Sequence, residues 1–228
     1  MNPDFVRAVR VARLAFVALI AIQAGCGDDG GTDPSKPSAM VAVSPDSQTT
    51  AAGVKMSQPL VVRVTGGGGA PIAGTVVDWS IGAGGGTVSD TNSTTNADGE
   101  AQTTYTPGNQ PAIAGVTAAA GSLRKTFRIV LVAGPPSELR KFGSDSPAAI
   151  TGSVLTLSVK LVDAFGNGVS AKPVSWAAAG GSINATTSTT NDGGVASVTY
   201  TLGADPGTYS LTASAEGVAS VTFAVKAI

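Results

Sequence analysis

The chain has 228 residues, of which 43% are hydrophobic and 13% charged, with 30 glycines, no histidine and a formal net charge of −1 at pH 7. The lack of histidine removes the commonest general base and the commonest metal ligand from any catalytic site. The small net charge offers nothing to attract nucleic acid. Many glycines and few charges are typical of short strands joined by tight turns.

The first 25 residues resemble the signal peptide of a bacterial lipoprotein. Three arginines precede an apolar run over residues 14–22, and the chain then continues with Gln23-Ala24-Gly25-Cys26. A positive region, a short apolar region and small residues before a cleavage site form the pattern of a secretory signal. The resemblance implies cleavage before Cys26, acylation of that cysteine and attachment to a membrane of the cell envelope. Because Gly27 rather than aspartate follows the cysteine, the resemblance favours the outer membrane.

This segment has two other interpretations. A membrane-spanning helix needs about 20 apolar residues, so the run over residues 14–22 is too short for a transmembrane anchor. An ordinary secretory signal remains an alternative, although it would leave Cys26, the only cysteine, as an unpaired thiol. A lipidated Cys26 leaves no thiol for catalysis, zinc binding or a disulfide.

Residues 26–38 are predicted to form a flexible tether. They are polar and rich in glycine and proline, so they cannot bury enough apolar area to fold. A flexible coil of this length reaches about 17 to 21 Å. That reach is enough to lift the following domain clear of the lipid headgroups.

The rest of the chain is an internal repeat. Trp79 and Trp176 are 97 residues apart, and Tyr105 and Tyr200 are 95 apart. The matching segments are Val77-Asp78-Trp79-Ser80 with Val174-Ser175-Trp176-Ala177, and Ser93-Thr94-Thr95-Asn96 with Ser188-Thr189-Thr190-Asn191. A repeat of this length predicts two domains, residues 39–133 and 134–228. The segment Val132-Ala133-Gly134-Pro135-Pro136 joins them, because glycine and two prolines interrupt strand structure.

Apolar and polar residues alternate with a period of two in both copies. The alternation covers residues 60–64 and 127–131 in the first copy, and residues 155–162 and 220–226 in the second. This period predicts strands with one buried face. The fold class is therefore all-β, with two tandem antiparallel β-sandwiches of about seven strands each. The expected large core residues are Trp79, Trp176, Tyr105 and Tyr200.

The second copy carries three motifs in order: an Asp-x-x-Gly-Asn turn at 163–167, a Val-x-Trp strand at 174–176, and Thr-Asn-x-x-Gly-x-Ala at 190–196. This order resembles the bacterial immunoglobulin-like domain of group 1, of the intimin and invasin type. The resemblance covers about residues 39–228, and the first copy departs from it where Gly66–Gly69 replaces the first turn. It implies immunoglobulin-like modules that act as rigid spacers or adhesive stalks.

The sequence indicates a protein that is not an enzyme and has no cofactor. The only adjacent carboxylates, Asp28 and Asp29, lie in the predicted tether, and no Gly-x-Ser-x-Gly motif is present. The glycine run Gly66–Gly69 lacks the Gly-Lys-Ser/Thr ending of a phosphate-binding loop. We therefore expect a lipid-anchored envelope protein with a structural or adhesive role.

Three binding interpretations stay open. Asp163, Asn167 and Asp192 carry oxygens that suit calcium, although the same residues are typical of plain turns. A sheet edge is a further candidate, because it would pair the chain with an envelope assembly. Five basic residues near the domain boundary suggest contact with an anionic glycan, although their pattern favours solvated strand faces: Arg124, Lys125, Arg128, Arg140 and Lys141.

Phe165 lies in the Asp163–Asn167 turn and is expected to be exposed. A single exposed apolar side chain is common on protein surfaces. The sequence therefore predicts no function for Phe165.

Overall fold

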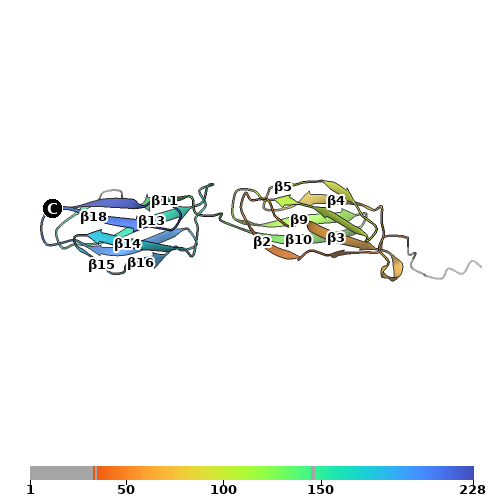
Figure 1. Cartoon of the computed structure of the whole chain (residues 1–228), viewed down its shortest axis with the longest axis horizontal. Helices are drawn as coiled ribbons and strands as arrows, with labels where there is room; N and C mark the ends of the chain where they lie inside the picture. The colour runs from red at the N-terminus through yellow and green to blue at the C-terminus, as the bar shows by residue number, and fades with distance from the viewer. Residues whose placement is uncertain (1–32, 34, 145–146) are drawn as a thin grey trace, which may run out of the picture. The chain divides into compact units, whose positions relative to one another are not determined.

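The computed structural model describes residues 33, 35–144 and 147–228. These residues form two β-sandwiches, one from each copy of the repeat (Figure 1). Apart from the single 3-10 turn Gly67–Gly69, every element among them is a strand. The predicted all-β class is confirmed. The proposed lipidation site Cys26 lies outside the described residues.

The first sandwich contains strands β1 to β10. A three-stranded sheet has the order β1-β3-β7, a five-stranded sheet has the order β2-β10-β9-β4-β6, and β5 pairs with β8. The strands are β1 (Ala39–Ala42), β2 (Ser47–Ala51), β3 (Leu60–Thr65), β4 (Val76–Ile81), β5 (Thr87–Val88), β6 (Asn92–Thr94), β7 (Glu100–Thr103), β8 (Tyr105–Thr106), β9 (Ala112–Ala120) and β10 (Leu123–Val132).

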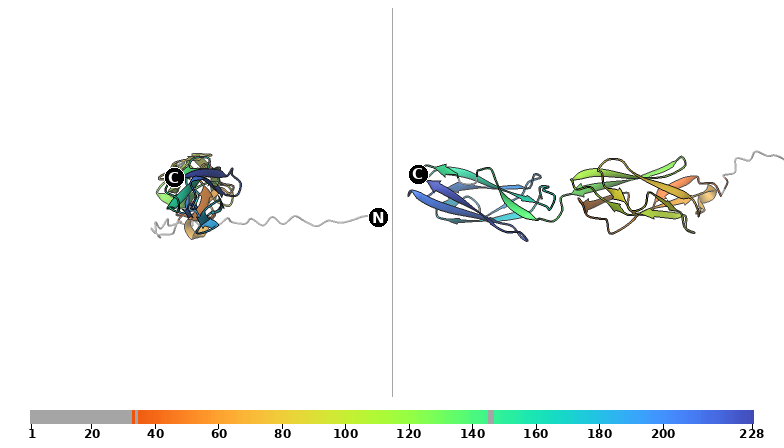
Figure 2. Two further views of the ribbon diagram at one scale, coloured as in Figure 1. Left: turned by 90° about the vertical axis from the view of Figure 1, so that its left-hand side faces the viewer. Right: turned by 90° about the horizontal axis from the view of Figure 1, so that it is seen from above.

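The second sandwich repeats this plan with strands β11 to β19, and Figure 2 shows its sheets from two further directions. A four-stranded sheet has the order β11-β13-β17-β15, and a five-stranded sheet has the order β12-β19-β18-β14-β16. The strands are β11 (Glu138–Phe142), β12 (Ala148–Ala149), β13 (Val154–Val162), β14 (Pro173–Ala179), β15 (Ser182–Ile183), β16 (Thr187–Thr189), β17 (Val195–Thr201), β18 (Gly207–Ser214) and β19 (Val221–Ala227).

The pairing is antiparallel with one exception in each sandwich. The N-terminal segment first pairs antiparallel in one sheet, as β1 with β3 or β11 with β13. It then crosses to the other sheet and pairs parallel there, as β2 with β10 or β12 with β19. The crossing lets one segment contribute an edge strand to both sheets, and it accounts for one of the strands beyond the seven expected in each sandwich.

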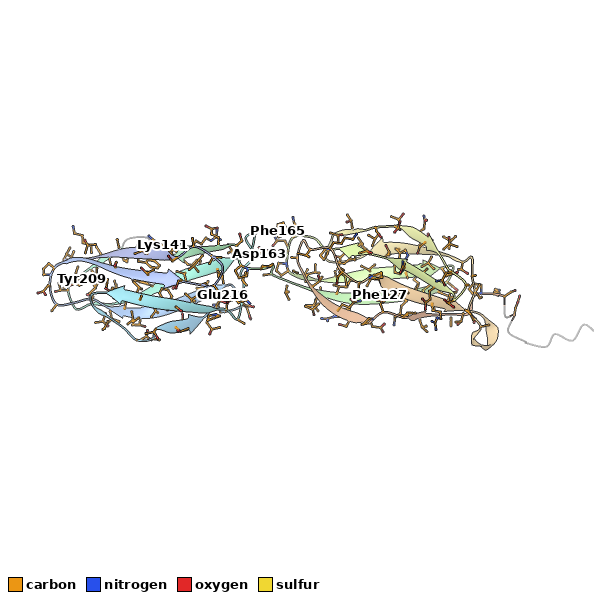
Figure 3. The ribbon with its side chains drawn as sticks, viewed as in Figure 1. Phe127, Lys141, Asp163, Phe165, Tyr209 and Glu216 are labelled. Atoms are coloured by element: carbon orange, nitrogen blue, oxygen red, sulfur yellow. The ribbon has the colours of Figure 1, made fainter. Side chains whose placement is uncertain are left out.

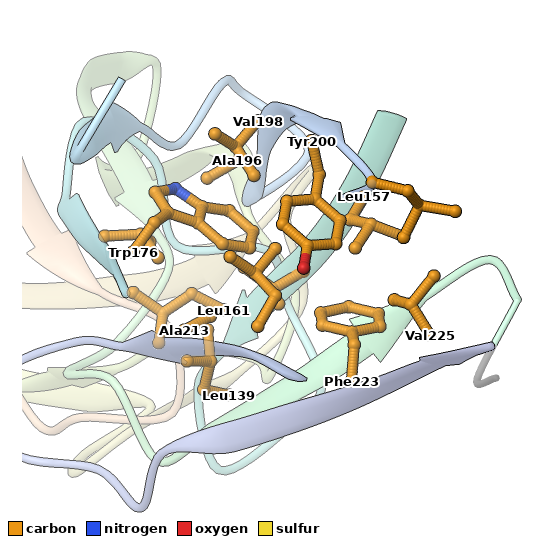
Figure 4. Packing of buried hydrophobic residues seen from close by; sticks show 14 of the residues in the cluster. Leu139, Leu157, Leu161, Trp176, Ala196, Val198, Tyr200, Ala213, Phe223 and Val225 are labelled. Atoms are coloured by element: carbon orange, nitrogen blue, oxygen red, sulfur yellow. The ribbon is translucent and has the colours of Figure 1, made fainter. Parts of the chain in front are cut away.

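Each sandwich has a core of its own. In β13 the side chains of Leu157, Val159 and Leu161 are buried, as the alternation predicts. Figure 4 shows Leu157 and Leu161 packed among Trp176, Tyr200 and Phe223 from other strands. The buried residues of the first core all fall between Met56 and Leu131, and those of the second between Leu139 and Ala227. Each core therefore consists of buried residues from its own copy alone.

The two tryptophans pack in matching environments. Trp79 is 4% exposed and lies opposite Ala118 in the register of β4 and β9. Trp176 is 3% exposed and lies opposite Ala213 in the register of β14 and β18. A small residue opposite each indole leaves room for the large ring between the two sheets. In the first core the Trp79 ring also stacks against Phe127, with ring centroids 6.3 Å apart.

The end of the segment expected to be a tether contacts the first sandwich. The backbone N–H of Ser38 donates to the carbonyl of Thr65 over 2.9 Å, and that of Gly67 donates to the carbonyl of Asp33 over 3.3 Å. The Asp33 carboxylate accepts bonds from the backbone and hydroxyl of Ser35. These bonds tie the chain to the Gly66–Gly69 turn from Asp33 onward.

Candidate functional site

The repeated Ser-Thr-Thr-Asn motif supplies polar partners to the core. The indole Nε1–H of Trp79 donates to Ser93 Oγ over 2.9 Å, and that of Trp176 donates to Ser188 Oγ over 2.8 Å. A buried indole without such a partner would lose a hydrogen bond that it makes in water. The first residue of the motif therefore lets each tryptophan enter the core.

The second threonine of the motif links two loops. Thr190 is 3% exposed, donates its hydroxyl to the Val169 carbonyl over 2.8 Å and accepts the Lys172 N–H over 2.9 Å. Among the described residues, buried side-chain nitrogen and oxygen atoms all have a partner. The first copy repeats both bonds of this threonine, with Thr95, Ile72 and Thr75.

The asparagine of the motif closes a turn. Asn191 Oδ1 accepts the backbone N–H groups of Gly193 and Val195, each over 3.0 Å. The first copy makes the same turn with Asn96, Asp98 and Glu100. An amide oxygen that accepts two backbone donors is committed to the turn. These roles assign the motif to folding in both copies.

The two tyrosines bond to glycine carbonyls. The hydroxyl of Tyr200 donates to the carbonyl of Gly180 over 2.7 Å, and that of Tyr105 donates to the carbonyl of Gly85. Both tyrosine side chains are 0% exposed to solvent, and this burial raises the pKa of each phenol. The hydroxyls are held as neutral donors and fix the glycine-rich loop of each sandwich.

The Asp163–Asn167 turn is where the second sandwich meets the segment that joins the two copies, as Figure 3 shows for Asp163 and Phe165. Asp163 is 3% exposed. Its Oδ1 accepts the N–H groups of Phe165 and Asn167, each over 2.9 Å. Its Oδ2 accepts the N–H of Gly134 and the side-chain amide of Asn167, each over 2.8 Å. One carboxylate therefore organises the turn and holds the joining segment to it.

Two opposing effects set the pKa of Asp163. Burial alone would raise the pKa, since it disfavours the charged form. The hydrogen bonds from Asn167, Gly134 and Phe165 favour the carboxylate and together outweigh burial, so the pKa of Asp163 lies below its usual value. The group is a buried anion that four N–H donors stabilise.

The same turn contacts the first sandwich. Asn167 Nδ2 donates to the backbone carbonyl of Asn109 over 2.8 Å, in addition to its bond to Asp163. The ring of Phe165 lies directly against Gly53, so that a Cβ at this position would clash with the ring. Phe165 is 44% exposed, which agrees with the expected exposure, but its covered part is in contact. Sequence reasoning missed Gly53 and Asn109, because nothing in the sequence relates them to a turn more than 50 residues away.

In the structure, two of the three residues proposed for calcium, Asp163 and Asn167, bond to each other and to neighbouring backbone groups. Both oxygens of Asp163 accept N–H donors, and Asn167 directs its Nδ2, a donor, toward Asp163 and Asn109. Asp192 is exposed in the following turn. In the part of the chain that the structure describes, no group of three or more His, Cys, Asp or Glu side chains is placed to hold a metal ion.

The five basic residues lie on different sheets. Arg124, Lys125 and Arg128 belong to β10 and Arg140 and Lys141 belong to β11. Lys125 forms an ion pair of 2.6 Å with Asp46, and Lys141 lies 5.4 Å above the ring of Phe223. Arg124 stands eight residues before the end of β10, or about 26 Å along the strand. The exposed side chains of Arg124 and Arg128 share one face of β10, since they are four residues apart.

Comparison with known proteins supports the fold. Residues 145–228 match the sequence family described as the bacterial Ig-like domain (group 1). No curated protein sequence matches the chain. Among residues 33, 35–144 and 147–228, no helix is long and apolar enough to cross a bilayer.

Solved structures of bacterial surface proteins resemble the two sandwiches. The Escherichia coli adhesin FdeC is 21% identical with a TM-score of 0.54, over 82% of this chain and 63% of that one. InvD of Yersinia pseudotuberculosis is 19% identical with a TM-score of 0.51, over 83% of this chain and 56% of that one. The D0-D1 domains of intimin are 20% identical with a TM-score of 0.33, over 82% of this chain and 98% of that one. The chain spans less than two thirds of FdeC and InvD, and at these identities the likeness concerns the fold.

The family match and the three motifs of the second copy cover the same sandwich. The first sandwich has the same hydrogen bonds of the tryptophan, the second threonine and the asparagine, but a different first turn. Residues 145–228 therefore carry the sequence pattern of a bacterial Ig-like domain of group 1, in a chain whose two sandwiches share the fold of the FdeC and InvD structures.

Proposed function

We propose that this protein is a non-enzymatic component of the bacterial cell envelope, anchored by a lipid on Cys26, whose two immunoglobulin-like sandwiches act as a structural spacer or adhesive stalk. The observation that carries this proposal is the joint. The Asp163–Asn167 turn holds both the joining segment and the first sandwich, and the buried polar groups around it serve this attachment. A module fixed to its neighbour in this way suits a spacer.

The likeness to the adhesin FdeC supports the adhesive role, and the resemblance of residues 1–26 to a lipoprotein signal supports the anchor. The domains proposed are a signal peptide at 1–25, a tether from residue 26, and sandwiches at 39–133 and 134–228. Among the described residues, the bonds to the first sandwich begin at Asp33.

The anchor is tested by replacing Cys26 with serine in cells that express the whole chain. We expect C26S to abolish labelling by a fatty-acid probe and to move the protein from the membrane fraction to the soluble fraction. Protease treatment of intact cells then separates a surface location, in which the sandwiches are removed, from a periplasmic one. Unchanged labelling of C26S would exclude the anchor.

Glycan binding is the second candidate, and the exposed pair Arg124 and Arg128 on one face of β10 is the observation that favours it. Arg140 lies on a separate sheet, so the proposed surface is smaller than the five residues suggest. We expect residues 32–228 to bind anionic glycans on an array only if Arg124 and Arg128 are intact. Binding that survives the R124S/R128S double variant would exclude this surface.

A further inference from the structure

The most exposed large apolar side chains of the described residues lie together at one end of the second sandwich. Ile150 is 70% exposed, Val154 is 63% exposed and Ile228 is 61% exposed. Backbone bonds hold them near one another, since the N–H of Thr151 donates to the Ile228 carbonyl over 3.1 Å and that of Ser153 donates to the Ile150 carbonyl over 3.0 Å. Exposed apolar groups that cluster in this way mark interaction surfaces more often than isolated ones do.

The first sandwich has the same local structure at the corresponding end. The N–H of Ala52 donates to the Val132 carbonyl over 2.8 Å, and that of Gly53 donates to the Gly108 carbonyl over 2.9 Å. The second sandwich repeats both bonds, from Thr151 to Ile228 and from Gly152 to Gly203, over 3.1 and 3.0 Å. The two glycines also share a positive φ, 71° at Gly53 and 76° at Gly152. By this correspondence, Ala204 occupies the position of Asn109.

In the first sandwich this end is occupied. The Phe165 ring covers Gly53, and the Asn167 amide donates to the Asn109 carbonyl. In the second sandwich the space over Gly152 is open, because a Cβ built there meets no atom within 4 Å. The loop beside it is held in place, since the hydroxyl of Tyr209 donates to the carbonyl of Asp205 over 2.7 Å.

We propose that this end of the second sandwich, hereafter the receiving end (Ile150, Gly152, Val154, Ala204 and Ile228), docks an immunoglobulin-like module that presents an Asp-x-aromatic-Gly-Asn turn. The aromatic ring covers Gly152 and packs against Ile150 and Ile228. The asparagine amide of the turn donates to the carbonyl of Ala204. The proposal does not depend on the lipid anchor or on the adhesive role.

A second copy of this chain is the poorer occupant. The turn of its first sandwich is Gly66–Gly69, which has neither an aromatic ring nor an amide side chain and is bonded to Asp33. The turn of its second sandwich is already seated on its own Gly53. The partner is therefore a module whose first turn is free.

A chain of three sandwiches tests the proposal. Residues 32–228 are extended directly with a second copy of residues 133–228, so that the new Ile228–Ala133 junction repeats Val132–Ala133. The added piece contains a complete core of its own. Covalent attachment keeps the partner at a high effective concentration, so that a weak contact is measurable. Hydrogen exchange is then measured at residues 150–154 and 203–205 in the middle sandwich.

We expect exchange at these residues to slow at least about tenfold relative to the two-sandwich chain. Two matched variants remove the effect if the contact is correct: Phe165→Ser in the added copy only, and Ile150→Asp in the middle sandwich. Both positions are exposed, so circular dichroism should remain unchanged. Equal exchange in the extended chain, the variants and the two-sandwich chain would overturn the proposal. Sedimentation of residues 32–228 as a dimer that I150D abolishes would also overturn it, in favour of a second copy as the partner.

Discussion

At the scale of single residues, the buried indole of Trp176 has the largest predicted effect on stability. Trp176→Ala removes a side chain that is 3% exposed and leaves Ser188 without its donor. We expect the free energy of unfolding of the second sandwich to fall by about 3 to 5 kcal/mol. Urea unfolding followed by circular dichroism measures the change. Val154→Ala, at an exposed position, is the control, and a loss under about 1 kcal/mol for Trp176→Ala would contradict the burial.

Asp163 makes the stability of the joint depend on pH. Its folded pKa lies below the usual value of 3.8, so its contribution is complete above that value and is lost as the pH falls through the folded pKa. Asp163→Asn replaces one acceptor oxygen with an amide NH2 that cannot accept from the buried N–H groups, and we expect a loss of about 1 to 3 kcal/mol at pH 7. The difference between wild type and D163N should shrink below about pH 4.

Urea midpoints measured from pH 7 down to pH 2 test this dependence. Asp192→Asn, at an exposed turn position, is the matched control and should show little change at any pH. A D163N effect of constant size across the range would show that the charge of Asp163 does not stabilise the fold.

At the scale of elements, the loop threonine Thr190 connects the end of β16 to the loop before β14. Thr190→Val keeps the shape of the side chain but removes the bonds to Val169 and Lys172. We expect a loss of about 1 to 3 kcal/mol in urea unfolding, because both backbone groups lose a partner. Thr189→Val, next in sequence but exposed, should change stability by less than about 0.5 kcal/mol. Equal effects of the two variants would contradict the structural role of Thr190.

The elements also show what the sequence could predict. Alternation over residues 155–162 predicted β13 (Val154–Val162) closely, because nine residues give a clear period of two. The strands β5, β8, β12 and β15 have two residues each, too few to show any period. The sequence did not predict the two parallel pairs, β2 with β10 and β12 with β19. Alternation shows which face of a strand is buried, but it carries no information on the neighbouring strand.

The candidate site could be predicted only in part, because a sequence pattern does not identify bonding partners that are distant along the chain. Asp163 and Asn167 stood out as turn residues, and the repeat made the Ser-Thr-Thr-Asn motif conspicuous. Their partners are separated in sequence, since Asn167 bonds to a residue 58 positions away. The spacing of Asp163, Asn167 and Asp192 favoured plain turns over calcium binding, but it did not reveal the N–H donors that occupy both oxygens of Asp163.

At the scale of the whole molecule, the two cores are separate. Two contacts link the sandwiches through one turn: the Phe165 ring lies on Gly53, and the Asn167 amide donates to the Asn109 carbonyl. We therefore expect the free energies of unfolding of the two sandwiches to be coupled mainly through this turn, since residues without shared partners contribute independently.

This coupling gives the last prediction. In residues 32–228, Phe165→Ser should lower the stability of the second sandwich by about 1 kcal/mol, within the range of directly contacting residues. In residues 133–228 alone the same substitution should have almost no effect, because Gly53 is missing. Fluorescence of Trp176 in a Trp79→Phe background reports the second sandwich in both pieces. If Phe165→Ser has the same effect in both, Phe165 acts within its own turn and the joint is held by Asn167 and Asp163.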